Sequence, residues 1–287
     1  MKGGLGAVDA GALGGYKRLG YIVVEDALND GDVEAILGAL GDVVADPAFA
    51  AAALETTRKQ AAGEVNLALG GCHPVLQFEN FAKSIPEEER FRLCNVRKLM
   101  GFHQFHPRLT ALATDPSLLA VIRGMLVEAG CSSEEVIDLD VFQSLALLKP
   151  KGGREKPWHQ DNSYFNIDGD EVKAAGVWIA LSDVTIENGA MHVFPGPLDE
   201  LEPLPHFSIR DWQICDSFCD EKPCVAVPLK PGGALFFSTL VPHGTPTNLG
   251  DTQRLAIQFH FAPKNYKTTS DAARLATYGG EGLGVNC

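Results

Sequence analysis

The sequence predicts a mainly β protein with flanking helices, in which two antiparallel sheets form a jelly-roll barrel. Two patterns support this fold class. After about residue 138, short runs of branched and aromatic residues alternate with glycine- and proline-rich turns, and no helical pattern separates them. Before about residue 135, apolar residues recur at helical spacing. Consecutive strands without crossover helices favour antiparallel sheets, so we expect the helices to buttress one outer face of the barrel.

Three helices are expected in the first half, after a glycine-rich stretch to about residue 16 that indicates a mobile lead-in. Residues 28–40 carry one apolar face behind an Asn-Asp cap. Residues 84–87, Ser-Ile-Pro-Glu, combine capping-box spacing with a proline in the first turn. They predict a helix that ends at about residues 91–98. The third helix, residues 115–130, begins with Asp-Pro and ends at a glycine.

Six strands are expected in the second half, because each stretch is rich in branched and aromatic residues and is bounded by turn signals. They are Asp138–Lys149, Val177–Val184, Ala190–Phe194, Cys224–Leu229, Ala234–Ser238 and Arg254–Ala262. We interpret residues 1–287 as one domain, with a helix-rich part at about 19–135, a jelly-roll core at about 138–263 and a tail at 264–287.

The composition excludes some classes of partner. A net charge of −13 and a pI near 5.0 argue against nucleic acid, because phosphate binding needs a basic surface. No stretch approaches the roughly 20 apolar residues of a membrane span, and the first residues lack the pattern of a secretory signal. We therefore expect no membrane partner and a cytoplasmic location. The sequence leaves the oligomeric state open.

The seven cysteines predict free thiols in a reducing compartment, because their number is odd and no secretion signal precedes them. Cys215, Cys219 and Cys224 are spaced C-x3-C-x4-C. Structural zinc sites use tighter pairs and a fourth ligand, so free thiols in a loop are the favoured interpretation of this cluster.

One motif suggests a metal site. His159-Gln160-Asp161 is the only His-x-Asp/Glu in the chain, and in extended backbone its two outer side chains point to the same side. His243, in Val-Pro-His-Gly-Thr, can complete a set of two imidazoles and one carboxylate. That set is typical of non-haem iron(II) oxygenases and leaves coordination positions open. The alternatives are a chance pair in a surface turn and a structural histidine.

Arg254 heads a strand with two different faces. Leu255, Ile257, Phe259 and Phe261 share one face, whereas Arg254, Ala256, Gln258 and His260 share the other. A buried arginine is costly unless it meets an anion, so Arg254 can bind a carboxylate through two parallel hydrogen bonds. The hydroxyl of Thr245 can add a third. The alternative is a structural salt bridge with one of the 37 acidic residues.

These segments resemble the phytanoyl-CoA dioxygenase family of iron(II)/2-oxoglutarate-dependent oxygenases. The resemblance covers roughly residues 19–263, and as an ordered set its motifs are specific. The matching segments are Gly20–Val24, Trp158–Phe165, Glu187–Gly196, Pro231–Phe237 and Val241–Asn248, with Arg254 downstream. The resemblance implies a double-stranded β-helix, the cupin-like form of the jelly roll. It also implies hydroxylation of an unactivated carbon in a small organic molecule, with release of succinate and carbon dioxide.

The resemblance assigns roles to single residues. It implies that His159, Asp161 and His243 bind iron(II) and carry catalysis. Arg254 would hold the distal carboxylate of the co-substrate 2-oxoglutarate, with Thr245 where the family often has serine. The other assigned positions are Lys98 facing the co-substrate, Gln143 lining the pocket and Trp178 near the iron. Lys98 can equally be a solvated helix end, Gln143 a barrel-filling polar residue and Trp178 core packing. Dioxygen is the second co-substrate, with ascorbate as a supporting reductant.

The sequence departs from the family pattern after Pro195-Gly196. The insert Asp199–Cys224 is expected to form a lid, and this leaves the substrate open. We find no basic cluster fit for the phosphates of coenzyme A. Candidate pocket residues, each of which can equally belong to the core, are Phe102, His103, His106, Tyr164, Phe165, Trp212 and Phe218.

Other outcomes stay open at this point. Desaturation, epoxidation or ring closure would use the same residues as hydroxylation. Two further alternatives are a cupin-type metal enzyme that does not use 2-oxoglutarate and a non-catalytic barrel that binds a small molecule. Neither explains both the intact metal motif and Arg254.

Overall fold

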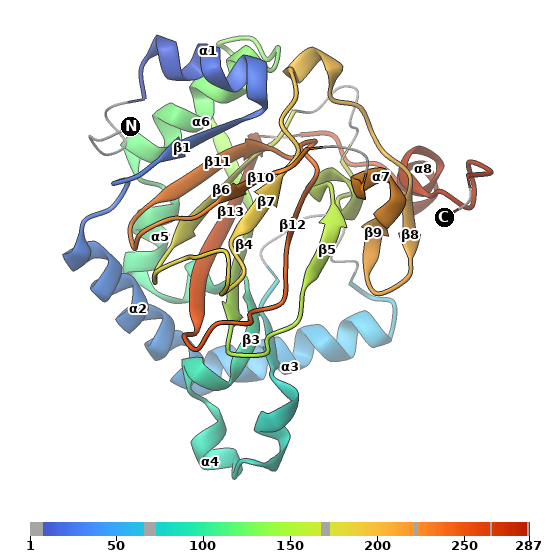
Figure 1. The fold of residues 1–287 in the computed structure, drawn as a ribbon. Helices are drawn as coiled ribbons and strands as arrows, with labels where there is room; N and C mark the ends of the chain where they lie inside the picture. Colours follow the sequence, from blue (N-terminus) through green and yellow to red (C-terminus); the bar gives the residue numbers. More distant parts are fainter. Residues whose placement is uncertain (1–7, 66–72, 168–172, 221–222, 265, 286) are drawn as a thin grey trace.

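Two antiparallel sheets form the centre of the protein (Figure 1). The computed structural model describes residues 8–65, 73–167, 173–220, 223–264, 266–285 and 287. The large sheet has the order β1-β11-β6-β13-β4-β3-β2. Its strands are β1 (Tyr21–Val24), β2 (Val75–Phe78), β3 (Val96–Met100), β4 (Leu139–Lys149), β6 (Ala175–Ala180), β11 (Ala234–Ser238) and β13 (Arg254–Pro263).

The small sheet has four strands in the order β10-β7-β12-β5. They are β5 (Lys156–His159), β7 (Met191–Val193), β10 (Val225–Val227) and β12 (His243–Thr245). A separate hairpin, β8 (His206–Ser208) with β9 (Trp212–Ile214), lies within the 199–224 insert. The predicted double-sheet arrangement is confirmed.

The α-helices of the described residues are α1 (Ala10–Leu19), α2 (Asp30–Ala45), α3 (Pro47–Ala61), α4 (Glu87–Arg90), α5 (Pro107–Ala113), α6 (Pro116–Glu128), α7 (Asp216–Asp220) and α8 (Asp271–Tyr278). Helices α1, α2, α3, α5 and α6 pack on the outer face of the large sheet (Figure 1). Ile257 and Phe259 of β13 share a core with Leu40 and Met125 of these helices. A second core, which includes Trp178, lies between the two sheets.

The segment Pro107–Glu128, which comprises α5 and α6, is long and apolar enough to cross a membrane by length and composition alone. Leu109, Ile122 and Met125 of this segment are fully buried in the core against the large sheet. These apolar side chains therefore already have a partner surface inside the protein, as in the core helix of a globular fold.

Two of the three predicted helices are confirmed, as α2 and α6. Their N-caps are Asn29, which accepts from the N–H of Asp32, and Asp115, which accepts from two N–H groups of α6. The prediction of a helix from residues 84–87 to about residues 91–98 is wrong for the residues after α4. There, residues 96–100 form β3 and pair with both β2 and β4, so sheet hydrogen bonds replace helical ones. The capping box is not formed, because Pro86 occupies the N-cap.

The expected mobile lead-in is wrong for the part of it that the structure describes. Ala10–Leu19 forms α1, which Asp9 caps at its start by accepting from the N–H of Ala12. Gly20 ends it in the left-handed region at φ 76°, where residues other than glycine are strained. The helix is held in place because Tyr16 is fully buried. Glycine content alone was a poor guide to order here.

The strand predictions are confirmed in position, with one shifted boundary. The strand expected at 177–184 is β6, which starts at Ala175 and ends at Ala180, because the chain turns away from β13 after it. The elements that had not been predicted are strands β1, β2, β3, β5, β8, β9 and β12 and helices α1, α3, α5, α7 and α8. The one-domain interpretation stays a prediction.

The prediction of free thiols is wrong for two cysteines. Cys215 and Cys287 form a disulfide with a Cα–Cα distance of 5.5 Å, which ties the 199–224 insert to the C-terminal residue. Cys94, Cys131 and Cys224 are free thiols, and Cys72 lies outside the described residues. Because Cys215 is already bonded, the weak zinc interpretation of the cysteine cluster does not hold.

Candidate metal centre

The three predicted metal-ligating side chains converge between the two sheets. His159 ends β5 and His243 begins β12, and these residues are directly opposite each other in the antiparallel ladder, with ring centroids 4.3 Å apart. Asp161 begins a short 3₁₀ helix after the extended residue Gln160. One ligand atom from each side chain lies within 4.8 Å of the other two, and all three residues are buried. This separation suits one ion bound at bond lengths of about 2.0–2.2 Å.

Both imidazoles are oriented by backbone carbonyls. Nδ1 of His159 hydrogen-bonds to the carbonyl of Pro157 at 2.8 Å, and Nδ1 of His243 to that of Val241 at 2.9 Å. Nδ1 therefore carries the proton and Nε2 keeps a lone pair for a metal. Burial, together with the nearby His243, lowers the pKa of His159 to about 3. Burial also lowers the pKa of His243, so both rings are neutral at physiological pH.

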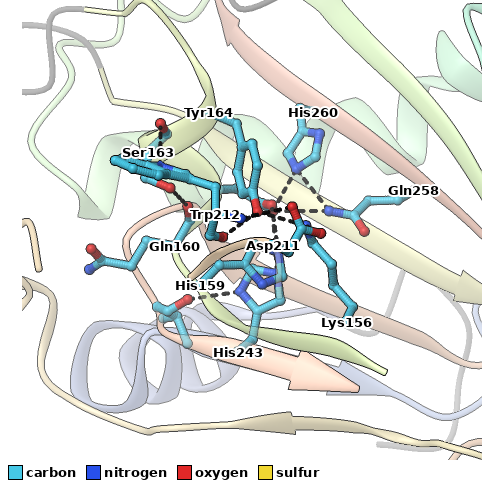
Figure 2. A network of polar contacts seen from close by, with 12 residues as sticks. Lys156, His159, Gln160, Ser163, Tyr164, Asp211, Trp212, His243, Gln258 and His260 are labelled. Atoms are coloured by element: carbon cyan, nitrogen blue, oxygen red, sulfur yellow. Dashed lines mark hydrogen bonds and ion pairs between the residues drawn. The ribbon is translucent and has the colours of Figure 1, made fainter. Parts of the chain in front are cut away.

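Two residues of β13, Gln258 and His260, orient Asp161. Figure 2 shows these two side chains next to each other. Oδ2 of Asp161 lies 2.7 Å from Nε2 of His260 and accepts from Nε2 of Gln258 at 3.0 Å. Burial alone would raise the pKa of Asp161, but the nearby His243 and His260 hold it well below its ordinary value. The carboxylate is therefore ionised. We had not assigned a role to Gln258 or His260, although their place on the same strand face as Arg254 was a usable signal.

Arg254 is a buried cation without a carboxylate partner among the described residues. It is 1% exposed, and its Nε and Nη1 atoms make no hydrogen bond within the described part of the chain. Its guanidinium carbon lies 5.2 Å from the centre of the Trp178 ring. Burial lowers the pKa of Arg254 to about 10, so it remains charged at neutral pH. Unsatisfied buried donors of this kind are costly, which favours an anion as the missing partner.

Lys149 is a second buried cation, and no sequence pattern had assigned it to the site. It is opposite Arg254 in the β4–β13 ladder and is 7% exposed. Its Nζ donates to Oγ1 of Thr245 at 2.9 Å and to the carbonyl of Pro246 at 2.5 Å. A Cβ at Gly153 would come within 2.6 Å of Lys149 Cγ, so that glycine makes room for the side chain. Burial and the neighbouring Arg254 lower the pKa of Lys149 to about 7.

One cavity of about 400 Å³ joins these groups. Besides the three metal-ligating residues, it is lined by four of the five residues assigned to the co-substrate, namely Lys98, Gln143, Thr245 and Arg254. Lys98 lies on a strand and not at a helix end. Trp178 is the exception. It is fully buried in the core between the sheets, where it packs beneath Arg254, and it is not part of the cavity lining.

The 199–224 insert covers one side of the metal motif. Gln160, between the two ligands, donates to the carbonyl of Glu202 and accepts from the N–H of Leu204. Tyr164 donates from its hydroxyl to the carbonyl of Trp212 at 2.5 Å (Figure 2). Arg210 and Asp211 of the insert line the cavity. The lid interpretation stays a prediction, but the insert is already in contact with the site.

Of the seven candidate pocket residues, Tyr164 and Phe165 line the cavity. The other five serve the surrounding structure. Phe102 belongs to the core beneath the helices, His103 hydrogen-bonds to Ser144, His106 caps α5, Trp212 stacks on His206, and Phe218 packs on Phe194.

Comparisons with known proteins identify the family of this chain. The profile of the phytanoyl-CoA dioxygenase (PhyH) family matches residues 16–256. Phytanoyl-CoA dioxygenase domain-containing protein 1 of Danio rerio is 29% identical over 156 residues, which are 52% of this chain and 53% of that protein. The chain thus spans about half the length of that relative. The homolog of that protein from Caenorhabditis briggsae is 22% identical over 270 residues, 87% of this chain and 89% of that protein.

A solved structure shows the same fold. EctD from S. alaskensis with 2-oxoglutarate and 5-hydroxyectoine has a TM-score of 0.61 at 22% identity, covering 95% of this chain and 80% of that chain. The predicted jelly roll with flanking helices is therefore confirmed. Because the family profile spans most of the sequence, this chain belongs to the phytanoyl-CoA dioxygenase family.

Proposed function

We propose that the protein is an iron(II)/2-oxoglutarate-dependent dioxygenase that hydroxylates an unactivated carbon of a small organic molecule. One observation carries the proposal: a buried set of His159, Asp161 and His243 shares a cavity with Arg254, a buried cation with unused donors. The first group fits a divalent metal, and the second fits the far carboxylate of a dicarboxylic acid. The same cavity meets both requirements of this class of enzyme.

The donor set fits iron(II). Two neutral imidazoles and one carboxylate are its common ligands, and they leave positions for a chelating keto acid and dioxygen. When bound, the metal with 2-oxoglutarate and dioxygen would supply an oxidative decarboxylation that yields succinate, carbon dioxide and an oxygenated substrate. The carbonyls that fix both histidines, and the two β13 residues that fix Asp161, would preserve the ligand geometry between turnovers.

The co-substrate would lie with its distal carboxylate at Arg254. Lys149 donates to Oγ1 of Thr245, so the Thr245 hydroxyl keeps its own proton available for that carboxylate. Lys98 and Gln143 would contact the co-substrate from the facing strands. We assign Trp178 a positioning role, in which its ring supports the guanidinium from below.

Succinate release tests the proposal. The purified protein with iron(II), ascorbate and 2-oxoglutarate should release succinate slowly alone and faster with its substrate. Asp161→Ala should abolish release and weaken metal binding, whereas Asp199→Ala, at an exposed position of the insert, should leave both unchanged. Release from Asp161→Ala at the wild-type rate would reject the metal assignment. Metal binding without any effect of 2-oxoglutarate would favour the cupin-type alternative instead.

The substrate is proposed to be a small molecule, and a cytoplasmic location stays a prediction. The EctD structure named above holds 5-hydroxyectoine, which shows that this fold can hold a small organic molecule beside 2-oxoglutarate. A reducing compartment agrees poorly with the bond between Cys215 and Cys287. Mass spectrometry of the protein under non-reducing conditions would test whether Cys215 and Cys287 are bonded. A bonded pair would argue against a reducing compartment.

A further inference from the structure

The cavity carries a charge opposite to that of the whole chain. The chain has a net charge of −13. The basic residues that line the cavity nevertheless outnumber the acidic ones. The basic residues are Arg97, Lys98, Lys149, Arg154, Lys156, Arg210 and Arg254, and the acidic ones are Glu155, Asp161 and Asp211. A positive cavity in an acidic protein concentrates anionic ligands, because low-dielectric walls focus its field.

The proposed metal and co-substrate account for only part of this charge. Asp161 would serve the metal, Arg254 would hold the distal carboxylate of 2-oxoglutarate beside the charge of Lys149, and Lys98 would contact the co-substrate. Two more cations already have acidic partners: Lys156 with Asp211 at 2.6 Å, and Arg210 with Glu155 at 2.7 Å. The cations left over are Arg97 and Arg154, and neither forms an ion pair with an acidic residue of the described cavity lining.

A β-bulge turns two successive residues of β3 toward the cavity. Gln77 of β2 pairs with Lys98, and the next residue, Phe78, pairs with Val96. Arg97 is thus the extra residue of the bulge. In a regular strand, Arg97 and Lys98 would point to opposite faces, but both line the cavity. Bulges occur next to active sites for this reason, since they re-aim a side chain.

Arg154 lies near the strand that pairs with the bulge. Burial raises the pKa of Glu79, which directly follows β2, and the charge of Arg154 partly offsets this rise. Glu79 does not line the cavity. Because β2 pairs with β3 at the bulge, Arg97 and Arg154 line the cavity beside the same strand pair.

We propose that the substrate carries an oxyanion, a carboxylate or a phosphate, which binds to Arg97 and Arg154. The rest of the substrate would lie along Leu145 and Leu147 of β4, which line the same cavity. This inference rests on the proposed function, because 2-oxoglutarate must fill the Arg254 end for the remaining charge to face the substrate. The sequence showed no basic cluster because residue 154 is far from residues 97 and 98 along the chain.

Matched probes test this inference by calorimetry. Hexyl phosphate, hexanoate and 1-hexanol share one carbon chain and differ in charge. Each is titrated into protein loaded with 2-oxoglutarate and manganese(II), which replaces iron and prevents turnover. At least one anionic probe should bind about tenfold or more tightly than 1-hexanol, the difference expected for one charge-assisted hydrogen bond. The tighter of the two anions identifies the group, and its affinity should fall as salt is raised.

Single substitutions locate the site. Arg97→Gln and Arg154→Gln should each weaken the anionic probe about tenfold and leave 2-oxoglutarate affinity within about twofold. Arg92→Gln, at an exposed position that does not line the cavity, is the matched control and should change neither. Equal binding of all three probes, or unchanged anion affinity in both variants, would overturn this inference and leave the proposed function standing. If 2-oxoglutarate itself fails to bind, the proposed function and this inference fall together.

Discussion

Replacing Lys149 by methionine should remove a pH-dependent cost to the stability of the ligand-free protein, although it also removes three hydrogen bonds. Lys149 is almost fully buried, and burial with the nearby Arg254 lowers its pKa from 10.5 to about 7. The folded state thus holds this proton less tightly than the unfolded chain. Between these two pKa values the unfolded chain carries more protons, so the wild type loses stability as the pH falls. Below about pH 7 Lys149 is charged in both the folded and the unfolded state, and the cost of burying its charge no longer changes with pH.

The expected change in stability follows from the pH range between the two pKa values of Lys149. Each pH unit within it changes the free energy of unfolding by about 1.4 kcal/mol. The stability of Lys149→Met relative to wild type should therefore increase by about 3 kcal/mol between about pH 9 and about pH 7. Methionine leaves the carbonyls of Thr245 and Pro246 without a donor, at a cost of about 1–3 kcal/mol each. That cost does not depend on pH, so the difference between the two pH values isolates the charge.

Urea unfolding of both proteins at several pH values, with a chelator and without 2-oxoglutarate, measures this difference. Lys151→Met is the matched control, because Lys151 is exposed and forms only a surface ion pair with Asp251. Its stability relative to wild type should stay flat with pH. The same Lys149→Met protein should bind 2-oxoglutarate about tenfold more weakly, because it loses a buried positive charge and the hydrogen bond that orients the Thr245 hydroxyl. A flat difference for Lys149→Met across this pH range would refute the assignment of a buried, proton-releasing cation.

Three further outcomes follow from the site and the disulfide. Arg254→Met should weaken 2-oxoglutarate binding about 100-fold in calorimetry and leave metal affinity unchanged, because only the carboxylate contact is lost; equal losses for both ligands would contradict it. His260→Phe should weaken metal binding about 10- to 100-fold in a chelator competition, since Asp161 loses a partner at 2.7 Å, and unchanged affinity would remove His260 from the site. Cys287→Ser should lower the free energy of unfolding by up to about 4 kcal/mol in urea, because the bond closes a loop of 72 residues; no change would argue against the disulfide.

The sequence predicted best what depends on alternation and local motifs. The two faces of β13 could be assigned from its residues alone, because a strand puts every second side chain on the same side. Ile257 and Phe259 are indeed buried beneath the helices, and Arg254 lies on the cavity side. The His159–Asp161 spacing predicted a shared direction for the same reason. These inferences needed no knowledge of what lies across the sheet.

The sequence predicted poorly what depends on partners far along the chain. Lys149 ends a predicted strand, and only the pairing of that strand with β13 shows that it is opposite Arg254. Arg97 is the extra residue of a bulge in β3, which only the pairing of β3 with β2 shows. Cys215 and Cys287 meet because the insert and the tail meet. In each case the role of the residue depends on a segment far along the chain. The pattern of residues within its own segment does not indicate that contact.

Trp178 shows why core and site cannot be separated in this fold. The small sheet supplies both histidines, and the large sheet supplies Arg254 and the residues that orient Asp161. In the proposed function, the distance from the metal to the far end of the co-substrate would therefore be set by how the two sheets pack. Trp178 lies in the core between them and its ring contacts the guanidinium of Arg254. Core packing at this residue would thus also position the co-substrate, since a shift in the packing would move the guanidinium relative to the histidines.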